Sequence, residues 1–243
     1  MLVLIKQDIK NLFSNPVTIL FCSIYPLALT LLFGFLFSSQ YGEMVSSYDF
    51  YGIAMMYYIV LAASTITPIT FMEKRLQKGN ERIAYAPVSK VQIYGSKLLA
   101  TYLFTAGFFI LDILLLQGIH LVSFGSGVYF WLVLLLYLVL LFFTISFGGA
   151  ICTIIQNQDL TNKIIGAVLN TLAIFSGIFF PISNLGTWAD SISNAIPLKW
   201  LLNTIFQIIY DQSIQGYLGI VVITMLLGGI CIGIIHKKYK VIS

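Results

Sequence analysis

The fold is decided by residues 128–155, which read VYFWLVLLLYLVLLFFTISFGGAICTII. This stretch contains no charged side chain. It is longer than the roughly 20 apolar residues that a helix needs to cross the hydrocarbon core of a bilayer. The sequence therefore predicts a transmembrane helix over Val128–Ile155.

The composition of the whole chain agrees with a membrane protein. Of its 243 residues, 59% are hydrophobic and 9% are charged, whereas a soluble domain carries about 25% charged residues. The net charge of +4 is small, and the basic residues flank the apolar runs. This distribution argues against nucleic acid as a partner, because nucleic-acid-binding proteins gather basic residues on a soluble face.

Five further segments are long and apolar enough to span, so the chain reads as a single all-α integral membrane domain over residues 1–243 with six transmembrane helices. The predicted spans are Val17–Phe37, Phe50–Met72, Leu98–Ile119, Val128–Ile155, Ile164–Ile182 and Tyr217–Ile235. The apolar stretch Ala195–Tyr210 is interrupted by proline and polar residues. We expect it to form a re-entrant or interfacial element within an extracellular region, residues 181–216, that precedes the last span.

The distribution of Lys and Arg predicts the orientation, since cytoplasmic loops carry an excess of both. With the N-terminus inside, all of the thirteen basic residues except Lys199 fall on the cytoplasmic side. We therefore expect a multi-pass protein of the cell (plasma) membrane, surrounded by lipid, with both chain ends in the cytoplasm.

Residues 1–14 differ in character from the spans. Leu2, Ile5, Ile9, Leu12 and Phe13 recur at helical spacing. The polar residues Lys6, Gln7, Asp8, Lys10 and Asn11 are assigned to the other face. This pattern predicts an amphipathic helix lying in the cytoplasmic headgroup plane. Asn15 should cap the following helix, with Pro16 at an early helical position.

The cytoplasmic loop over residues 73–97 reads EKRLQKGNERIAYAPVSKVQIYGSK. It is too long, and carries too many charged residues, for a simple turn. We expect a short helix over Glu81–Tyr85 that ends before Pro87, because the residue before proline disfavours helical geometry. Ser89 should cap the next helix. A solvated loop is the plainer interpretation of each single charge, whereas the whole pattern favours a rigid element that transmits force.

Motifs for chemistry are missing from the sequence. It has no G-x-x-x-x-G-K-[ST] phosphate loop, no H-E-x-x-H pair and no G-x-S-x-G elbow. The three cysteines lie singly within apolar runs, which favours buried small side chains over a metal site. We expect a protein without catalytic residues, that is, not an enzyme.

The sequence resembles the type-2 ABC exporter permeases, the ABC-2 family. In that family the loop after the second span carries a charged run, a glycine, Glu-Arg, and then Pro-Val-Ser. Glu81, Arg82 and residues 87–89 match that spacing, while Gly79 lies one residue closer to Glu81 than is common. Ser14-Asn15-Pro16 before the first span and residues 176–181, SGIFFP, extend the resemblance over nearly the full chain.

The resemblance implies a permease subunit that pairs with cytoplasmic ABC ATPase subunits and with a second permease copy, for which we expect a homodimer. ATP and Mg would bind the ATPase, so this chain would bind no cofactor itself. The expected cargo is hydrophobic or amphipathic: a drug, an antimicrobial peptide or an amphipathic peptide toxin. The residues expected to contact the ATPase are Lys6, Lys10, Glu73, Arg75, Gly79, Glu81, Arg82, Pro87, Val88 and Ser89.

A substrate pathway or gate has fewer candidates. Asp112 is the only carboxylate inside a predicted span, where a charge costs about 2.5–3.5 kcal/mol and should face protein or water. It could line a pathway or form a packing hydrogen bond with Gln117 or a partner helix. Pro26 and Pro68 can kink their helices. Phe179 and Phe180 could seal the outer mouth or belong to an interfacial aromatic belt.

Two other classes of function remain open from the sequence. One is a secondary transporter or channel that needs no ATPase, for which a single intramembrane carboxylate is thin support. The other is a non-transporting membrane scaffold or immunity protein. Both predict the absence of an ATPase partner.

Overall fold

The computed structural model describes residues 1–40, 45–73, 88–179 and 187–239. Every regular element in these ranges is a helix, which confirms the all-α prediction. The elements are α1 (Leu2–Phe13), α2 (Pro16–Leu36), η1 (Ser38–Gln40), α3 (Ser47–Ala62), η2 (Ala63–Thr65), α4 (Ile66–Met72), α6 (Lys90–Gly118), α7 (Val128–Ile155), α8 (Gln158–Phe175), α9 (Thr187–Ala195), α10 (Pro197–Tyr210) and α11 (Tyr217–Lys238).

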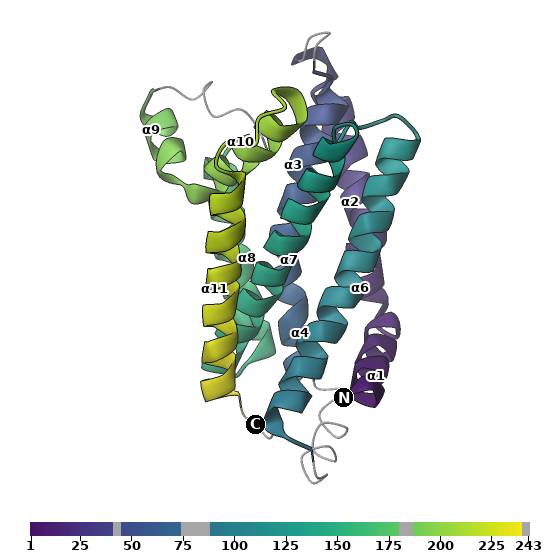
Figure 1. Cartoon of the computed structure of the whole chain (residues 1–243), viewed down its shortest axis with the longest axis vertical. Coiled ribbons are helices and arrows are strands. Elements are labelled where there is room, and N and C mark those ends of the chain that lie inside the picture. The colour runs from purple at the N-terminus through teal and green to yellow at the C-terminus, as the bar shows by residue number, and fades with distance from the viewer. Residues whose placement is uncertain (41–44, 74–87, 180–186, 240–243) are drawn as a thin grey trace.

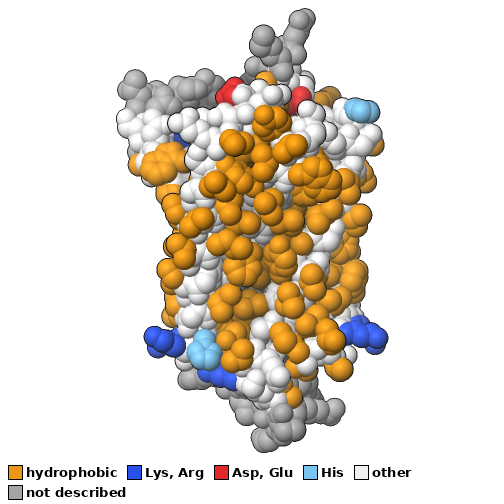
Figure 2. Space-filling model, in the orientation of Figure 1, with side chains coloured by type: hydrophobic (Ala, Val, Ile, Leu, Met, Phe, Trp, Pro, Cys, Tyr) orange, Lys and Arg blue, Asp and Glu red, His pale blue; other side chains and the backbone are white. Residues whose placement is uncertain are grey.

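The long helices form a bundle in which two ends can be distinguished (Figure 1). One end holds α1, the end of α4, the start of α6 and the end of α11, and the other holds α9 and α10. Basic side chains gather at the first end and acidic ones at the second, while the surface between them is largely hydrophobic (Figure 2). We call the first end, which contains Lys6, Lys10, Lys90 and Lys237, the basic end.

Five helical segments in the described ranges are long and apolar enough to cross a membrane, so the chain is a multi-pass membrane protein. They are Pro16–Leu36, Ser47–Met72, Lys90–Gly118, Val128–Ile155 and Tyr217–Lys238. The fifth predicted span, Ile164–Ile182, had the wrong bounds. Its helix, α8, begins at Gln158 and ends at Phe175. The polar residues in its first turns lower its mean hydropathy, so it is not one of the five segments.

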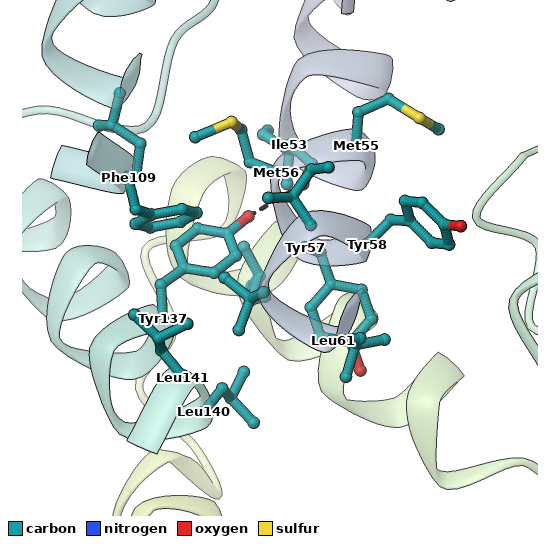
Figure 3. Packing of buried hydrophobic residues seen from close by; sticks show 14 of the residues in the cluster. Ile53, Met55, Met56, Tyr57, Tyr58, Leu61, Phe109, Tyr137, Leu140 and Leu141 are labelled. Carbon is teal, nitrogen blue, oxygen red and sulfur yellow. Dashed lines mark hydrogen bonds between the residues drawn. The ribbon is translucent and has the colours of Figure 1, made fainter. Parts of the chain in front are cut away.

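The helix pair α3 and α7 forms the centre of the bundle. In the Ser47–Met72 segment, 89% of the most apolar stretch of 18 residues is buried inside the protein. In α2 and in α11 the corresponding share is 22%. Tyr57 and Tyr137 have no exposed surface, and the Tyr137 hydroxyl donates to the Ile53 carbonyl over 3.0 Å (Figure 3). Because α3 is covered on all sides, the other helices are organised around it.

The second span is broken in the middle. A single 3₁₀ turn, η2, separates α3 from α4, and Pro68 follows within the next turn. Proline has no N–H to donate to the carbonyl four residues earlier, here that of Ser64. A Cβ built on Gly148 of α7 would collide with that carbonyl oxygen and would lie 2.7 Å from its carbon. The break therefore fits against α7 only because residue 148 lacks a side chain.

Side-chain hydroxyl groups form hydrogen bonds across the contact with α7 on both sides of this break. Thr144 of α7 donates to the Val60 carbonyl over 2.8 Å, and Thr67 of α4 donates to the Ile145 carbonyl over 2.9 Å. Backbone groups in a membrane interior have no water to bind. The two threonines thus satisfy carbonyls while fixing α3 and α4 to the same helix.

Two predicted helix starts are confirmed. The Asn15 side chain accepts from Val17 N over 3.1 Å at the start of α2. Ser89 forms a capping box with Gln92 at the start of α6. The short helix expected over Glu81–Tyr85 lies outside the described residues.

The N-terminal helix is present, but it does not lie across the end of the bundle as expected of a helix in the headgroup plane. Instead it runs beside the first half of α6: Met1 lies near Gly95, and the Phe13 and Phe104 ring centroids are 4.9 Å apart. Asp8, assigned from sequence to the polar face, is buried together with Ile5 and Leu12. Its polar side chain led to that assignment, although its spacing from Ile5 and Leu12 places it on their face.

The stretch Ala195–Tyr210 does not run through the bundle. It contains α10, which begins at Pro197 and lies at the end opposite the basic end (Figure 1). The Tyr57 hydroxyl donates to the Leu198 carbonyl over 3.2 Å, so the start of α10 is attached to the central helix.

We predict that Gly148→Ala lowers the free energy of unfolding by about 1–3 kcal/mol, the usual cost of overpacking a tight contact. The new methyl group would have to displace the Ser64 backbone. The measurement is the thermal unfolding midpoint of the purified chain in detergent. Gly166→Ala is the control, since a Cβ there meets nothing within 4 Å. Equal midpoints for the two variants would contradict the close contact.

Candidate functional site

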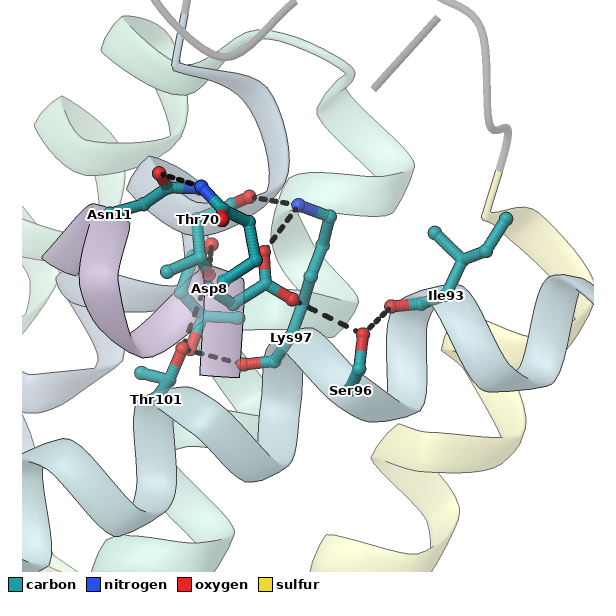
Figure 4. A network of polar contacts seen from close by, with 9 residues as sticks. Asp8, Asn11, Thr70, Ile93, Ser96, Lys97 and Thr101 are labelled. Atoms are coloured by element: carbon teal, nitrogen blue, oxygen red, sulfur yellow. Dashed lines mark hydrogen bonds and ion pairs between the residues drawn. The ribbon is translucent and has the colours of Figure 1, made fainter. Parts of the chain in front are cut away.

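At the basic end, a buried ion pair joins α1 to α6. Lys97 Nζ lies 3.4 Å from Asp8 Oδ1, and the two residues are 2% and 6% exposed (Figure 4). The second carboxylate oxygen of Asp8 accepts from the Ser96 hydroxyl over 3.2 Å. Buried charges of this kind occur where they are paired and hydrogen-bonded.

The same lysine also reaches the end of the second span. Lys97 Nζ donates to the Thr70 carbonyl in the last turns of α4 over 3.0 Å. The hydroxyls of Thr70 and Thr101 are 3.2 Å apart, and Thr101 donates to the Lys97 carbonyl. One ammonium group therefore contacts α1 and α4 from α6, and we call Asp8, Thr70, Ser96, Lys97 and Thr101 the lysine network.

The end of α4 is held on a second side by the C-terminal helix. Tyr239, directly after α11, packs edge-on against Phe71 with 5.2 Å between ring centroids. The Tyr94 hydroxyl of α6 lies 3.1 Å from His236 Nδ1. Burial, and secondarily the nearby Asp8 charge, raises the pKa of the Tyr239 phenol above its ordinary value. Segments far apart in the chain thus converge on the last two turns of α4.

Part of the surface predicted from sequence to bind an ATPase lies around this network. Lys6 and Lys10 are exposed on α1, Glu73 directly follows α4, and Val88 and Ser89 precede α6. A small cavity of about 10 Å³ lies between α1 and the end of α4, and Asp8, Thr70 and Glu73 are among the residues that line it. The remaining predicted contact residues Arg75, Gly79, Glu81, Arg82 and Pro87 lie outside the described residues.

Sequence reasoning missed the lysine network. Asp8 follows Ile5 by three residues and precedes Leu12 by four, so a helical count places it on their buried face. That acidic residue on an apolar stripe was the available signal for a buried partner. Nothing in the spacing identified Lys97, which is 89 positions away, as that partner.

The predicted gate residues are not brought together. Asp112 is 5% exposed, and its Oδ2 atom has no hydrogen-bond partner among the described residues. Gln117 is not its partner, because it bonds to Gly125 O and Phe124 N. Asp112 lies near Cys22 of α2, which precedes Pro26 by one turn.

The other gate candidates lie elsewhere in the bundle. Phe179 packs against Phe33 and Tyr58, at 5.8 and 5.1 Å between ring centroids. Pro68 lies in α4, in the half of the second span nearer the basic end. Phe180 is outside the described residues.

A cavity that the sequence did not reveal lies between α7, α8, α10 and α11. Its volume is about 640 Å³, and its lining is almost entirely apolar, with Leu140, Ile165, Leu169, Leu201 and Leu227 among the contributors. None of the four described gate residues, Asp112, Pro26, Pro68 and Phe179, lines it. It could accommodate only an apolar molecule or an apolar part of one.

The described residues contain no cluster of three or more His, Cys, Asp or Glu side chains that could hold a metal ion. What the basic end does offer is a mechanical connection. A displacement of α1 would act on the end of α4 through Asp8 and Lys97 rather than through solvent.

We predict that Asp8→Asn lowers the free energy of unfolding by about 3–5 kcal/mol, because it leaves the Lys97 ammonium buried without its counter-charge. Adding Lys97→Gln should recover part of this loss. Both are measured as thermal unfolding midpoints in detergent, with Asp159→Asn, an exposed carboxylate on α8, as the control. If the single and double variants unfold at the same temperature, the pair is not coupled.

Two comparisons bear on the family. The model of the ABC-2 type transporter family matches residues 1–210. A Dictyostelium discoideum protein named ABC transporter G family member 9 is 29% identical over 82 residues, which are 33% of this chain and 6% of that protein. This chain therefore spans a small part of that relative. Because the family model covers most of the sequence, including α1 and all helices through α10, the protein belongs to the ABC-2 type transporter family.

Proposed function

We propose that the chain is the permease subunit of an ATP-driven exporter, working with a separate cytoplasmic ABC ATPase. The observation that carries this proposal is the lysine network: it joins α1, the end of α4 and the start of α6 at the basic end. An ATPase pressing on this end would move these three segments together. The sequence has no phosphate loop of its own, so ATP and Mg would bind the partner.

The proposed orientation places the basic end in the cytoplasm. Lys6, Lys10, Lys163 and Lys237 are exposed at or near this end, whereas Lys199 lies on α10 at the other. The positive-inside rule favours this arrangement. Both chain ends then face the cytoplasm, and we assign the protein to the plasma membrane.

We further propose that α8 is the sixth span and that α9 and α10 form a re-entrant element on the outer side. The helix α8 packs beside α7 along the bundle, and its Asn170 accepts from the Tyr58 hydroxyl over 2.7 Å. With 18 residues, α8 is close to the length a membrane span requires.

A second permease copy would cover one face of α8. Lys163, Ala167, Asn170 and Thr171 are all exposed there, at helical spacing. The amide of Asn170 would be unfavourable against lipid, so this face of α8 is better placed against protein. Identical copies related by two-fold symmetry are the commonest closed assembly, and we propose a homodimer.

The proposed cargo is hydrophobic or amphipathic, such as a drug, an antimicrobial peptide or an amphipathic peptide toxin. The support is the apolar interior of the bundle, including the cavity of about 640 Å³, and the small amount of chain at the outer end. A strongly polar cargo would need charged or hydrogen-bonding groups along its path.

We predict that a soluble ATPase co-purifies with the wild-type chain from its native host in mild detergent. Lys6→Glu combined with Lys10→Glu should weaken that association at least severalfold, because it reverses two exposed charges on α1. The matched control is Lys237→Glu with Lys238→Glu, which reverses two exposed charges at the same end on α11.

A second variant tests the loop outside the described residues: Glu81→Ala, Arg82→Ala and Pro87→Ala together should also release the ATPase. Recovery of the folded wild-type chain without any ATPase would contradict the permease proposal. It would favour an ATP-independent transporter or channel, or a scaffold or immunity protein.

A further inference from the structure

The carboxyl group of Asp112 lies in the bundle interior without an opposite charge beside it. The residue is 5% exposed, and its Oδ2 atom has no hydrogen-bond partner among the described residues. On the same helix, Lys97 is 15 positions earlier, which corresponds to about 22 Å of α-helix, and its ammonium group binds Asp8. His120 lies beyond the end of α6 and is exposed. Asp112 therefore has no counter-charge on its own helix.

The helices packed around α6 supply no counter-charge either. These helices are α1, α2, α3, α4 and α7. The sequences of α2, α4 and α7 contain no charged residue. The Asp49 carboxylate of α3 lies at the outer end of that helix and accepts from Ser123 N over 2.7 Å. The charges of α1 lie at the basic end, on Lys6, Asp8 and Lys10.

Close to the level of Asp112, the titratable groups on these helices are a thiol and phenols. The Cys22 thiol of α2 lies near Asp112. On α7 the Tyr137 hydroxyl donates to the Ile53 carbonyl over 3.0 Å, and on α3 Tyr51 packs against phenylalanine rings of α2. An ionised carboxylate that is buried without a counter-charge is strongly disfavoured. A protonated carboxyl group is neutral, and its O–H needs one acceptor.

The first transmembrane helix provides such an acceptor. Proline has no N–H, so Pro26 leaves the Cys22 carbonyl without the donor four residues later in α2. The side chains of both residues are buried, and residues four apart lie on the same face of a helix. The carbonyl between them is therefore directed along the buried face of α2, toward the level of Pro26.

Asp112 lies at that level of the bundle. Helices α2 and α6 both run away from the basic end (Figure 1). Cys22 lines a cavity of about 10 Å³ together with Thr105 and Phe109 of α6. One turn further along, α2 reaches Pro26 and α6 reaches Asp112. The cavity has room for about one water molecule, so a direct bond between the two helices fits the space better than a hydrated path.

We propose that Asp112 is a proton-binding site, whose protonated carboxyl group donates a hydrogen bond to the Cys22 carbonyl that Pro26 leaves free. This bond attaches α2 to α6, just as Lys97 attaches α1 to α6 at the basic end. Because α1 and α2 are consecutive, the two contacts fix both of them to the same helix. The site belongs to the chain alone and does not depend on the ATPase or on the cargo.

The proton is tested by infrared spectroscopy of the full chain at pH 7 in dodecyl maltoside, a detergent without a carbonyl group. We expect the C=O stretching band of a protonated carboxylic acid in the wild type and its loss in Asp112→Asn. Asp159→Asn, which changes an exposed carboxylate of α8, is the control and should keep the band. A wild-type spectrum without the band, or a band that persists in Asp112→Asn, would overturn the proposal.

The acceptor is tested in the same spectra with Pro26→Ala, which returns an N–H to the Cys22 carbonyl. We expect the Asp112 band to shift to higher frequency, because a carboxyl group with a weaker hydrogen bond has a stiffer C=O bond. Thr30→Val is the control: the Thr30 hydroxyl is buried one turn beyond Pro26 and has no partner among the described residues. A shift with Thr30→Val, or none with Pro26→Ala, would show that the acceptor is not this carbonyl.

A double-mutant cycle measures the contact through stability. Asp112→Leu removes the donor, whereas Asp112→Asn keeps an N–H that can reach the same carbonyl. We therefore expect Asp112→Leu to have the lower thermal unfolding midpoint of the two in detergent. In the Pro26→Ala background, where the carbonyl has a helical donor, Asp112→Leu should shift the midpoint by about half as much or less. Equal shifts in both backgrounds would mean that Asp112 and the carbonyl are not coupled, which contradicts the proposal.

Discussion

The structure depends on one buried ammonium group, that of Lys97. A charge in this position is tolerated only with an opposite charge and further hydrogen bonds, and these come from Asp8 of α1 and from the Thr70 carbonyl of α4. The requirement fixes the N-terminal helix against α6 and the end of the second span against both. What would otherwise be three separate segments at the basic end becomes one unit, and this is the unit on which a soluble partner could act.

The same physical rule operates deeper in the bundle. Where η2 interrupts the second span, side-chain hydroxyls from Thr144 and Thr67 bind carbonyls across the helix contact, and Gly148 lets the backbones approach. Backbone polar groups away from water have to be satisfied within the protein. The break between α3 and α4 is therefore stabilised by specific contacts with α7. It connects the large apolar cavity, which Leu61 and Ser64 line, to the turn of α4 that Lys97 holds.

Much of the fold could be predicted from the sequence, because apolar runs such as residues 128–155 are set by the thickness of the bilayer. The helix caps at Asn15 and Ser89 could also be predicted, since capping is a local interaction. The bounds of α8 were not, because its first turns are polar, and its place in the bundle comes from packing against α7, α4 and η2. The site was harder still: the Asp8–Lys97 contact and the cavity join residues far apart in the chain, and no periodicity encodes such contacts. Asp112 stays a prediction: the sequence marked it as a rare intramembrane carboxylate, and the structure buries it with no hydrogen-bond partner for its Oδ2 atom among the described residues.

The central claim is that Lys97 couples α1 to α4. It is tested most directly by hydrogen–deuterium exchange of the backbone amides in detergent, comparing the wild-type chain with Lys97→Gln. Local protection of this kind reports how firmly each segment is held. The account predicts faster exchange in both Leu2–Phe13 and Ile66–Met72, with exchange in α7 unchanged. Unchanged protection of α1 and α4 in the folded variant would contradict it.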